Sequence, residues 1–297
     1  MPRCRLCFSD EAKLLWAVRG NPDYRVYLCT TCGARSLSPQ PTESHLRELY
    51  SKHYYDAWGY REDSGSVRDM KLSTFRLRLE LIKKYKPRGN VLDVGCATGF
   101  FLEAAREAGF APFGVEFSDY SSKIAKGKFG EDSIFEGVLD DCPFPERQID
   151  VVTMFDLLEH VRDPHSVMEK TRRLLKDDGI VVIMTPDTDS LTQRLMREKW
   201  VHYKIEHLYY FNRKSIRLLA DRHGFRLVHL QPARKTLNLA YSYHQFQVYR
   251  HWLLTPVFSL VHAVLPDKAL QANIKVIVGE MVAVLQKQPP AEEVKHP

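Results

Sequence analysis

The feature that most constrains this chain is an apolar strand followed at once by a glycine-rich turn and a helix. The pattern predicts a strand at 91–94, a turn at 95–99, a helix at 101–108 and a second strand at 113–115 that ends at Glu116. Strand, helix and strand in this order form a βαβ unit, whose parallel strands need helices on both faces of their sheet. The pattern therefore predicts an α/β fold with a doubly wound sheet.

The glycine turn is typical of a loop that binds a nucleotide. Glycines let the backbone approach a ligand closely, and an acid about 20 residues beyond such a loop binds the hydroxyls of a ribose, which is the position of Glu116. Gly95 and Gly99 are four residues apart, so the turn is not the Gly-x-Gly-x-x-Gly of dinucleotide folds. It also has no Gly-Lys-Ser/Thr of a phosphate loop. A ribose-containing ligand is expected.

The loop closely resembles motif I of the class I S-adenosylmethionine-dependent methyltransferases, whose usual form is Val-Leu-Asp-Val-Gly-Cys-Gly-Thr-Gly. This chain departs from that form only at Ala97. The resemblance covers residues 87–287. It continues through the third-strand loop at 137–145, the strand at 149–154 with its Asp-Leu-Leu-Glu-His-Val segment, the strand at 180–184 and a last antiparallel strand at 275–287. It implies a Rossmann-like, seven-stranded methyltransferase sheet.

The resemblance also implies the cofactor and its contacts. S-adenosylmethionine is the implied methyl donor, with Asp93 directed to its ammonium group and Glu116 to its ribose. The third-strand loop has Val138 where the family has an acid, so Asp140 or the backbone of Leu139 is expected to hold the adenine amine. The full set of implied cofactor residues is Asp93, Gly95, Cys96, Ala97, Gly99, Phe100, Glu116, Phe117, Leu139, Asp140 and Asp156.

Two histidines are candidates for a general base, which is needed only if the methyl acceptor must lose a proton. His160 follows Asp156 by four residues, which would place both on one face of a helix. His207 lies in a Glu-His-Leu stretch that recurs in some small-molecule methyltransferases. Histidine suits the role because its pKa lies near neutrality. Alternatively, either histidine packs or caps a helix. Weaker candidates for shaping an acceptor pocket are His202, Tyr203 and Tyr209.

Four of the six cysteines form two Cys-x-x-Cys pairs, Cys4 with Cys7 and Cys29 with Cys32. Two such turns supply four thiolates for tetrahedral zinc, and a closed four-thiolate shell favours a structural role. Short strands between the pairs predict a zinc ribbon over residues 1–40. The start of the chain has no apolar run after basic residues, and no stretch of 18 apolar residues follows. These features predict a cytoplasmic protein without a secretory signal or a spanning helix.

The remaining segments are predicted from their composition. Residues 41–86 read as a helical linker with an aromatic segment at 50–60, and 288–297 as a disordered tail. An apolar insertion at 241–273 is too interrupted to span a bilayer. It could contact a membrane surface, cover the acceptor or form a dimer face, so the oligomeric state stays open. The ribbon and linker together resemble the N-terminal extension of methyltransferases that include deoxysugar C-methyltransferases.

The function expected from this resemblance is methyl transfer to the oxygen or carbon of a small molecule, such as a sugar nucleotide or a natural-product intermediate. An RNA or protein methyltransferase and a non-catalytic cofactor-binding protein are the alternatives. Lys and Arg exceed Asp and Glu by 43 to 37, a mild excess that identifies no anionic partner. Nucleic acid is disfavoured, because Asn/Asp-Pro-Pro-aromatic is absent after the fourth strand and Cys142-Pro143 reverses the Pro-Cys order of cytosine-C5 enzymes.

Overall fold

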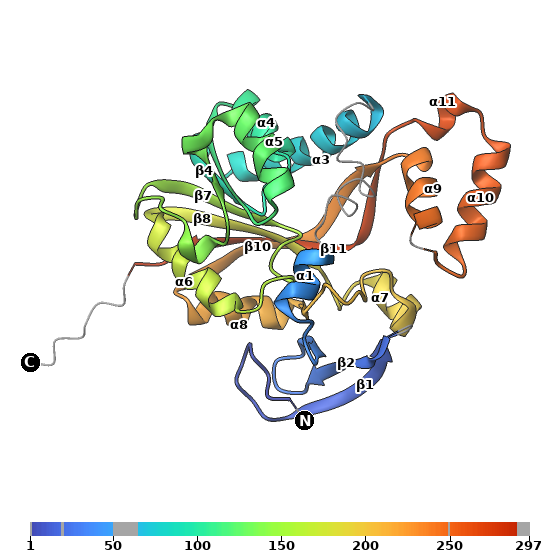
Figure 1. Ribbon diagram of the computed structural model, residues 1–297. Helices are drawn as coiled ribbons and strands as arrows, with labels where there is room; N and C mark the ends of the chain where they lie inside the picture. The colour runs from blue at the N-terminus through green and yellow to red at the C-terminus, as the bar shows by residue number, and fades with distance from the viewer. Residues whose placement is uncertain (1, 19–20, 50–64, 249, 290–297) are drawn as a thin grey trace, which may run out of the picture.

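The structure is a computed structural model that describes residues 2–18, 21–49, 65–248 and 250–289 (Figure 1). The aromatic segment at 50–60 lies outside the described residues, as do residues 290–297 of the predicted tail.

A seven-stranded sheet forms the centre of the molecule, with strand order β10-β11-β8-β7-β4-β5-β6. The five strands β4 to β8 are parallel, and β11 lies antiparallel between β8 and β10. The strands are β4 (Gly89–Val94), β5 (Phe110–Glu116), β6 (Ile134–Glu136), β7 (Ile149–Phe155), β8 (Leu175–Pro186), β10 (Phe225–Leu237) and β11 (Ile274–Lys287). The predicted α/β class with a seven-stranded methyltransferase sheet is confirmed.

Helices cover both faces of this sheet (Figure 1). One face packs against α3, α4 and α5, and the other packs against α6 and α8. The bounds are α1 (Glu43–Leu49), α3 (Gly65–Lys83), α4 (Phe100–Glu107), α5 (Asp119–Phe129), α6 (Pro164–Leu174), α7 (Leu191–Met196) and α8 (Arg213–Arg222), with single 3-10 turns η1 (Glu131–Ser133), η2 (Leu139–Asp141) and η3 (Arg197–Lys199). Burial on both faces explains why β7 and residues 180–184 of β8 are mostly apolar.

The N-terminal segment forms a second, four-stranded sheet in the order β1-β2-β3-β9. Its strands β1 (Ala12–Val18), β2 (Asn21–Cys29) and β3 (Arg35–Ser38) come from the predicted ribbon, whereas β9 (Tyr209–Tyr210) comes from the larger domain. Arg35 pairs with Tyr210, and Ser36 pairs with Tyr209. The buried cysteines of this sheet belong to the same apolar core as α6 and α8. The ribbon is therefore joined to the larger domain by both backbone pairing and packing.

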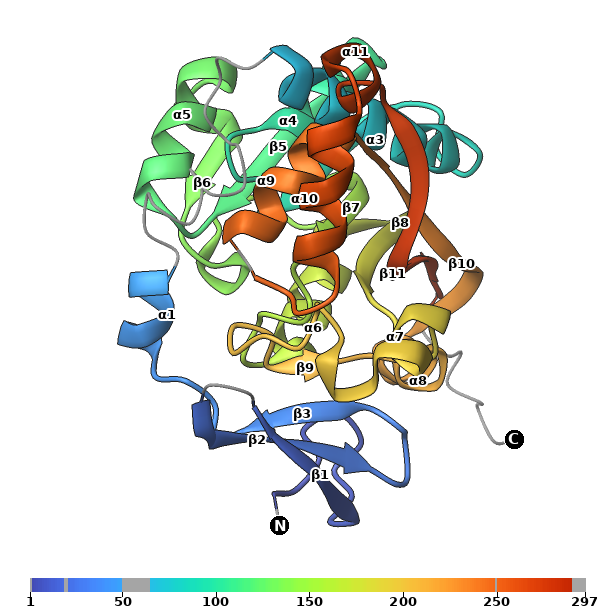
Figure 2. The same cartoon turned by 90° about the vertical axis from the view of Figure 1, so that its right-hand side faces the viewer.

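The segment between β10 and β11 forms three helices, α9 (Leu239–Val248), α10 (Leu254–Val264) and α11 (Asp267–Leu270). These helices project from one end of the central sheet (Figures 1 and 2). Within the described residues, no helix has both the length and the apolar content needed to cross a bilayer.

Candidate functional site

The glycine turn after β4 forms a tight backbone loop with three residues at positive φ. Gly95, Ala97 and Gly99 have φ of 79°, 47° and 87°. The amides of Gly95 and Cys96 both donate to the carbonyl oxygen of Val115, at 2.8 and 3.1 Å, which ties the loop to the end of β5. A Cβ at Gly99 would lie 2.6 Å from the ring of Phe129. Glycine at position 99 is therefore required both by its φ and by the space beside it.

Ala97 carries the strain of this loop, because an L-residue other than glycine disfavours positive φ. We expect Ala97→Gly to raise the free energy of unfolding by about 0.5–1 kcal/mol, since it relieves roughly 1–2 kcal/mol of strain while increasing unfolded-state entropy by about 0.4–1 kcal/mol. Thermal unfolding in the absence of ligand measures this. Ala108→Gly is the matched control, because φ of −82° at Ala108 offers no strain to relieve, and it should lower the melting temperature. A lower melting temperature for both variants would contradict the expectation.

Asp93 is the last polar side chain of β4 and is buried at the base of the loop. The hydroxyl of Thr153, its register partner on β7, donates to Asp93 Oδ1 at 2.6 Å. Burial raises the pKa of Asp93 to about 7, opposed by the Thr153 hydrogen bond. A cationic ammonium group bound near this carboxyl would favour its ionised form.

Glu116 ends β5 and is also buried. Its Oε2 accepts from the amide of Ala97, and its Oε1 accepts from the amide of Ser118, each at 2.8 Å. These two bonds fix the orientation of the carboxylate. Glu116 thus links the glycine loop to the turn that follows β5.

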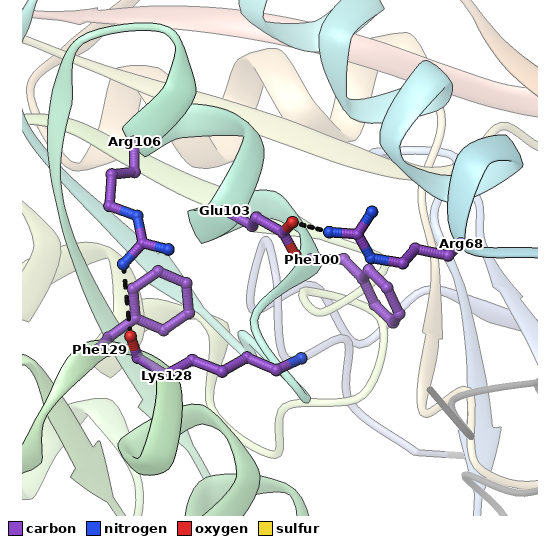
Figure 3. Close-up of a pocket in the computed structure, with 6 residues that line it drawn as sticks. All are labelled: Arg68, Phe100, Glu103, Arg106, Lys128 and Phe129. Carbon is purple, nitrogen blue, oxygen red and sulfur yellow. Dashed lines mark hydrogen bonds and ion pairs between the residues drawn. The ribbon is translucent and has the colours of Figure 1, made fainter. Parts of the chain in front are cut away.

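The other predicted cofactor residues differ in position. Cys96 is buried, and a Cβ added at Gly114 would lie 2.6 Å from its sulfur atom. Burial raises the pKa of the Cys96 thiol. A buried thiol of raised pKa is inert, so Cys96 fills space. Phe100 lines an open cavity with Arg68, Glu103, Arg106, Lys128 and Phe129 (Figure 3). Leu139 is buried in η2, Asp140 beside it is exposed, and Phe117 is half-buried.

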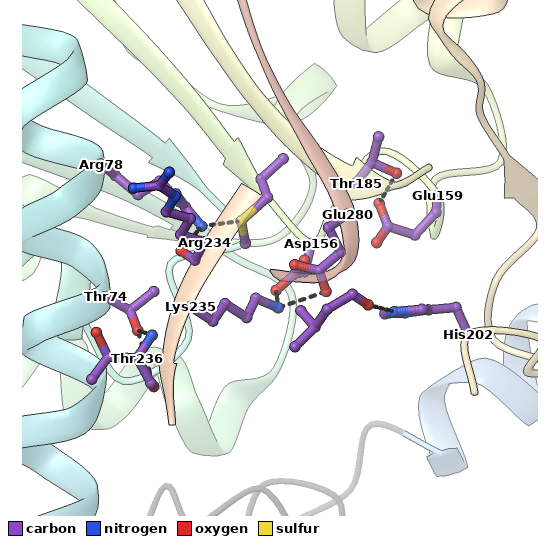
Figure 4. Close-up of polar contacts among 12 residues, drawn as sticks. Thr74, Arg78, Asp156, Glu159, Thr185, His202, Arg234, Lys235, Thr236 and Glu280 are labelled. Carbon is purple, nitrogen blue, oxygen red and sulfur yellow. Dashed lines mark hydrogen bonds and ion pairs between the residues drawn. The ribbon is translucent and has the colours of Figure 1, made fainter. Parts of the chain in front are cut away.

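Asp156 follows β7 and is the centre of a charged cluster that the sequence did not predict. Lys235 Nζ lies 2.9 Å from Asp156 Oδ2 and 2.7 Å from Glu280 Oε1 (Figure 4). Lys235 comes from β10 and Glu280 from β11, whose antiparallel pairing carries both to this edge. Burial opposes the charge on Lys235, but the two carboxylates outweigh it and raise the lysine's pKa. Only the tertiary fold brings these three residues together.

The two candidate bases lie against each other, although the helix expected between Asp156 and His160 is absent. That prediction is wrong, because Asp156 has φ of 54° and the segment to His160 is a non-helical turn. The turn nevertheless brings the rings of His160 and His207 to 4.6 Å between centroids. His160 Nδ1 lies 3.0 Å from the carbonyl oxygen of Glu206, which can only accept, so Nδ1 carries the proton and Nε2 is basic.

Both histidines are neutral near pH 7, because burial lowers their pKa values. His207 Nδ1 is buried without a hydrogen-bond partner among the described residues. Glu159 lies beside the pair, and its carboxylate accepts from Thr185 at 2.8 Å. Buried polar atoms are normally satisfied, so this ring nitrogen of His207 is available to a ligand.

The weaker acceptor-pocket candidates make other contacts. The Tyr203 hydroxyl accepts from Arg35 of the ribbon, and the Tyr209 hydroxyl donates to the carbonyl of Arg162 at 3.0 Å. His202 Nε2 lies 3.0 Å from the carbonyl of Val278 on β11. Tyr203 therefore joins the ribbon to the larger domain, whereas the Tyr209 hydroxyl bond lies within the larger domain and His202 contacts the sheet.

The four ribbon cysteines form one cluster that fits a tetrahedral metal ion. Their sulfur atoms lie within 4.8 Å of one another. Cys4 Sγ is 3.7 Å from Cys32 Sγ, and Cys7 Sγ is 3.4 Å from Cys29 Sγ. Thiolate sulfurs on a tetrahedron around zinc, each about 2.3 Å from the metal, lie at similar separations.

The ribbon also contacts the segment that holds the candidate bases. The Leu37 amide of β3 donates to the carbonyl of Leu208 at 3.0 Å, one residue after His207. On the other side, the Leu208 amide donates to the carbonyl of Glu159 at 2.8 Å, one residue before His160. Both histidines are thus one residue from a backbone bridge that begins in the ribbon.

Comparison with known proteins identifies the family from this sheet and loop. A model described as "Methyltransferase domain" matches residues 66–230. The chain belongs to this family. Its larger domain is a class I S-adenosylmethionine-dependent methyltransferase domain, and the expected family resemblance is confirmed. The methyltransferase chain is also similar in fold to the magnesium protoporphyrin IX methyltransferase of Synechocystis PCC 6803, solved with bound S-adenosylhomocysteine. That similarity has a TM-score of 0.54 and 12% identity and covers 83% of this chain and all of that one.

Curated relatives match only part of their own length. The ubiquinone biosynthesis O-methyltransferase of Bordetella avium is 36% identical over 118 residues, which is 37% of this chain and 48% of that protein. An uncharacterised protein of Methanocaldococcus jannaschii is 27% identical over 140 residues, 47% of this chain and 65% of that one. The chain thus spans about half the length of the curated relatives it matches.

Proposed function

We propose that this methyltransferase transfers a methyl group from S-adenosylmethionine to a hydroxyl group or activated carbon of a small molecule. The observation that carries the proposal is the contact between the buried ring of His207 and the half-buried ring of His160, which lies in the turn after Asp156 at the end of β7. Such a pair can accept a proton from an acceptor held at this edge of the sheet. The relatives named as O-methyltransferases favour oxygen as the methylated atom.

The cofactor is proposed to lie along the ends of β4 and β5. S-adenosylmethionine, when bound, supplies an activated methyl group on a sulfonium centre. Asp93 and the loop from Gly95 to Gly99 would hold the amino-acid part, and Glu116 would accept from the ribose hydroxyls. The remaining work of the protein is to position the acceptor, exclude water and take up a proton.

His207 is proposed as the base, with His160 holding it in place through the ring contact. We expect His207→Gln to lower kcat/KM by about 10²–10⁴-fold, the usual contribution of a general base. A base must be neutral to act, so activity falls as pH falls through its pKa. Because burial lowers that pKa, the acid limb of the wild-type kcat/KM profile should lie below pH 6.5.

Two measurements separate this role from a structural one. The acid limb of the kcat/KM profile should disappear in His207→Gln. The control is His229→Gln, at a half-buried histidine of β10 beside Tyr85, which should keep both the acid limb and the wild-type kcat/KM. An acid limb that survives in His207→Gln would remove His207 from the role of base. Equal loss of the binding of S-adenosylhomocysteine would indicate misfolding instead.

The acceptor class is tested by the release of S-adenosylhomocysteine with three sets of substrates. Small phenols, catechols and sugar nucleotides are expected to support turnover, and RNA or denatured protein is not. Turnover with RNA or protein alone would overturn the small-molecule assignment. Tight cofactor binding without turnover on a metabolite extract would indicate a binding protein.

The ribbon is proposed to hold one structural zinc ion on Cys4, Cys7, Cys29 and Cys32. Four thiolates complete a tetrahedral shell and leave no position for a reacting water molecule. Metal analysis of the reduced protein should give about one zinc per chain.

A further inference from the structure

The outer face of α10 carries a row of exposed apolar side chains. Leu253, Val257, Leu260 and Val264 have exposed fractions of 48, 47, 67 and 72%. Their spacing of four, three and four residues places them on one side of the helix. We call these four residues the α10 stripe. No other part of the described chain covers the stripe, and such rows of exposed apolar residues mark interaction sites.

The inner face of α10 packs against α9, so the α10 stripe is not the face that joins this helix to the rest of the protein. The rings of Phe258 and Phe246 stack with centroids 4.9 Å apart, and His262 stacks on Tyr243 at 4.0 Å. Gln247 donates to Ser259 at 3.0 Å. These contacts join α10 to α9 on one side only, and Figure 1 shows α10 farther from the central sheet than α9.

The ends of the stripe have the residues that the surface of a bilayer favours. Residues 254–264 contain no Lys, Arg, Asp or Glu. The flanking segments 250–253 and 265–268, together with 194–199, hold five Lys or Arg and two acids. Trp252 precedes the helix with 58% of its surface exposed, and Lys199 Nζ lies 4.6 Å from its ring. Tryptophan and flanking cations match the headgroup region, and the cations complement anionic lipids.

A second copy of the chain is a poorer occupant of this face. An 11-residue helix is roughly 16 Å long, so the stripe can bury only about 200 Å² on each partner. A stable dimer needs roughly 800 Å² per partner. A bilayer has no such requirement, because a helix that lies in its surface is bound by the apolar side chains it inserts and by the charges around them.

We propose that the α10 stripe inserts into the surface of an anionic phospholipid bilayer, with α10 lying in the plane of the membrane. The α9–α11 segment is carried by β10 and β11, the strands that also supply Lys235 and Glu280 to the charged cluster. Membrane contact would thus place the candidate active site close to the lipid surface. The proposal rests on the stripe and its flanking charges and is independent of the proposed methyl acceptor.

Sedimentation of the full chain with large unilamellar vesicles tests the proposal. With vesicles of phosphatidylglycerol and phosphatidylcholine, most of the wild-type chain should pellet. Binding should fall at least tenfold with phosphatidylcholine alone or at 1 M salt, where charges are screened within about 3 Å. The double variant Leu260→Asp/Val264→Asp should also lose at least tenfold in partitioning. Leu14→Asp, at an exposed leucine of β1, is the matched control and should bind like the wild type.

Folding and self-association are checked in the same proteins. Binding of S-adenosylhomocysteine to the double variant should be unchanged, which excludes misfolding as the cause. A Leu260→Cys variant labelled with an environment-sensitive dye should brighten on anionic vesicles. Failure of the wild type to pellet, or equal pelleting of the double variant, would overturn the proposal. So would a wild-type dimer in sedimentation velocity that the double variant abolishes.

Discussion

Glu116→Gln should weaken the binding of S-adenosylhomocysteine by about 30- to 1000-fold. The carboxylate is held by the amides of Ala97 and Ser118, and it is proposed to accept both ribose hydroxyls. Hydrogen bonds to a charged acceptor contribute about 1.5–3 kcal/mol each, and an amide group keeps only one acceptor atom. The NH₂ group of the glutamine would also face the backbone N–H of either Ala97 or Ser118, so that two donors would meet. Calorimetric titration of the purified protein measures the change.

Glu136→Gln is the control for this prediction. Glu136 is the register partner of Glu116 on β6, but its carboxylate accepts from Ser122 at 2.8 Å and faces Lys126. The same substitution there should change affinity by less than about threefold, because it loses only a surface contact. Equal weakening by both variants, or none by Glu116→Gln, would contradict the ribose assignment.

Loss of the proposed ribbon zinc ion should disorganise the candidate bases more than the proposed cofactor site. Structural zinc in small domains contributes apparent free energies of about 10–16 kcal/mol at pH 7, so Cys29→Ser should leave the ribbon largely unfolded. Strand β3 would then no longer pair with β9, next to His207. We expect kcat/KM to fall at least tenfold. Hydrogen exchange across 36–38 and 208–211 should speed up by more than tenfold, which reports the loss of pairing directly.

Cys142→Ser separates this effect from the loss of any buried cysteine. Cys142 is buried beside η2, outside the four-cysteine cluster. Its substitution should leave the zinc content and the exchange at 208–211 unchanged. Affinity for S-adenosylhomocysteine should change by less than about threefold in Cys29→Ser, because the loop after β4 makes its contacts within the central sheet. Preserved exchange protection in metal-free protein would contradict the coupling of ribbon and site.

The glycine loop could be predicted because its requirements are local. A strand, a turn with glycines at fixed spacing and an acid one strand later lie within residues 91–116. Their geometry follows from the backbone of a single βαβ unit. The same holds for the two Cys-x-x-Cys turns, since each places two sulfurs on one tight turn. The ion pair at Asp156 could not be predicted in this way, because its partner Lys235 lies on β10, 79 residues further along the chain.

The sequence by itself determined the fold class, the glycine loop with Glu116 and the four-cysteine cluster, because each is specified by residues close together in the chain. Tertiary structure decided three further features. It paired His160 with His207, it joined Lys235 and Glu280 to Asp156, and it placed a strand of the larger domain in the ribbon sheet. These contacts join residues more than 40 positions apart. Their positions in the sequence follow no helical or strand period, so the contacts depend on the order and direction of the strands in the sheets.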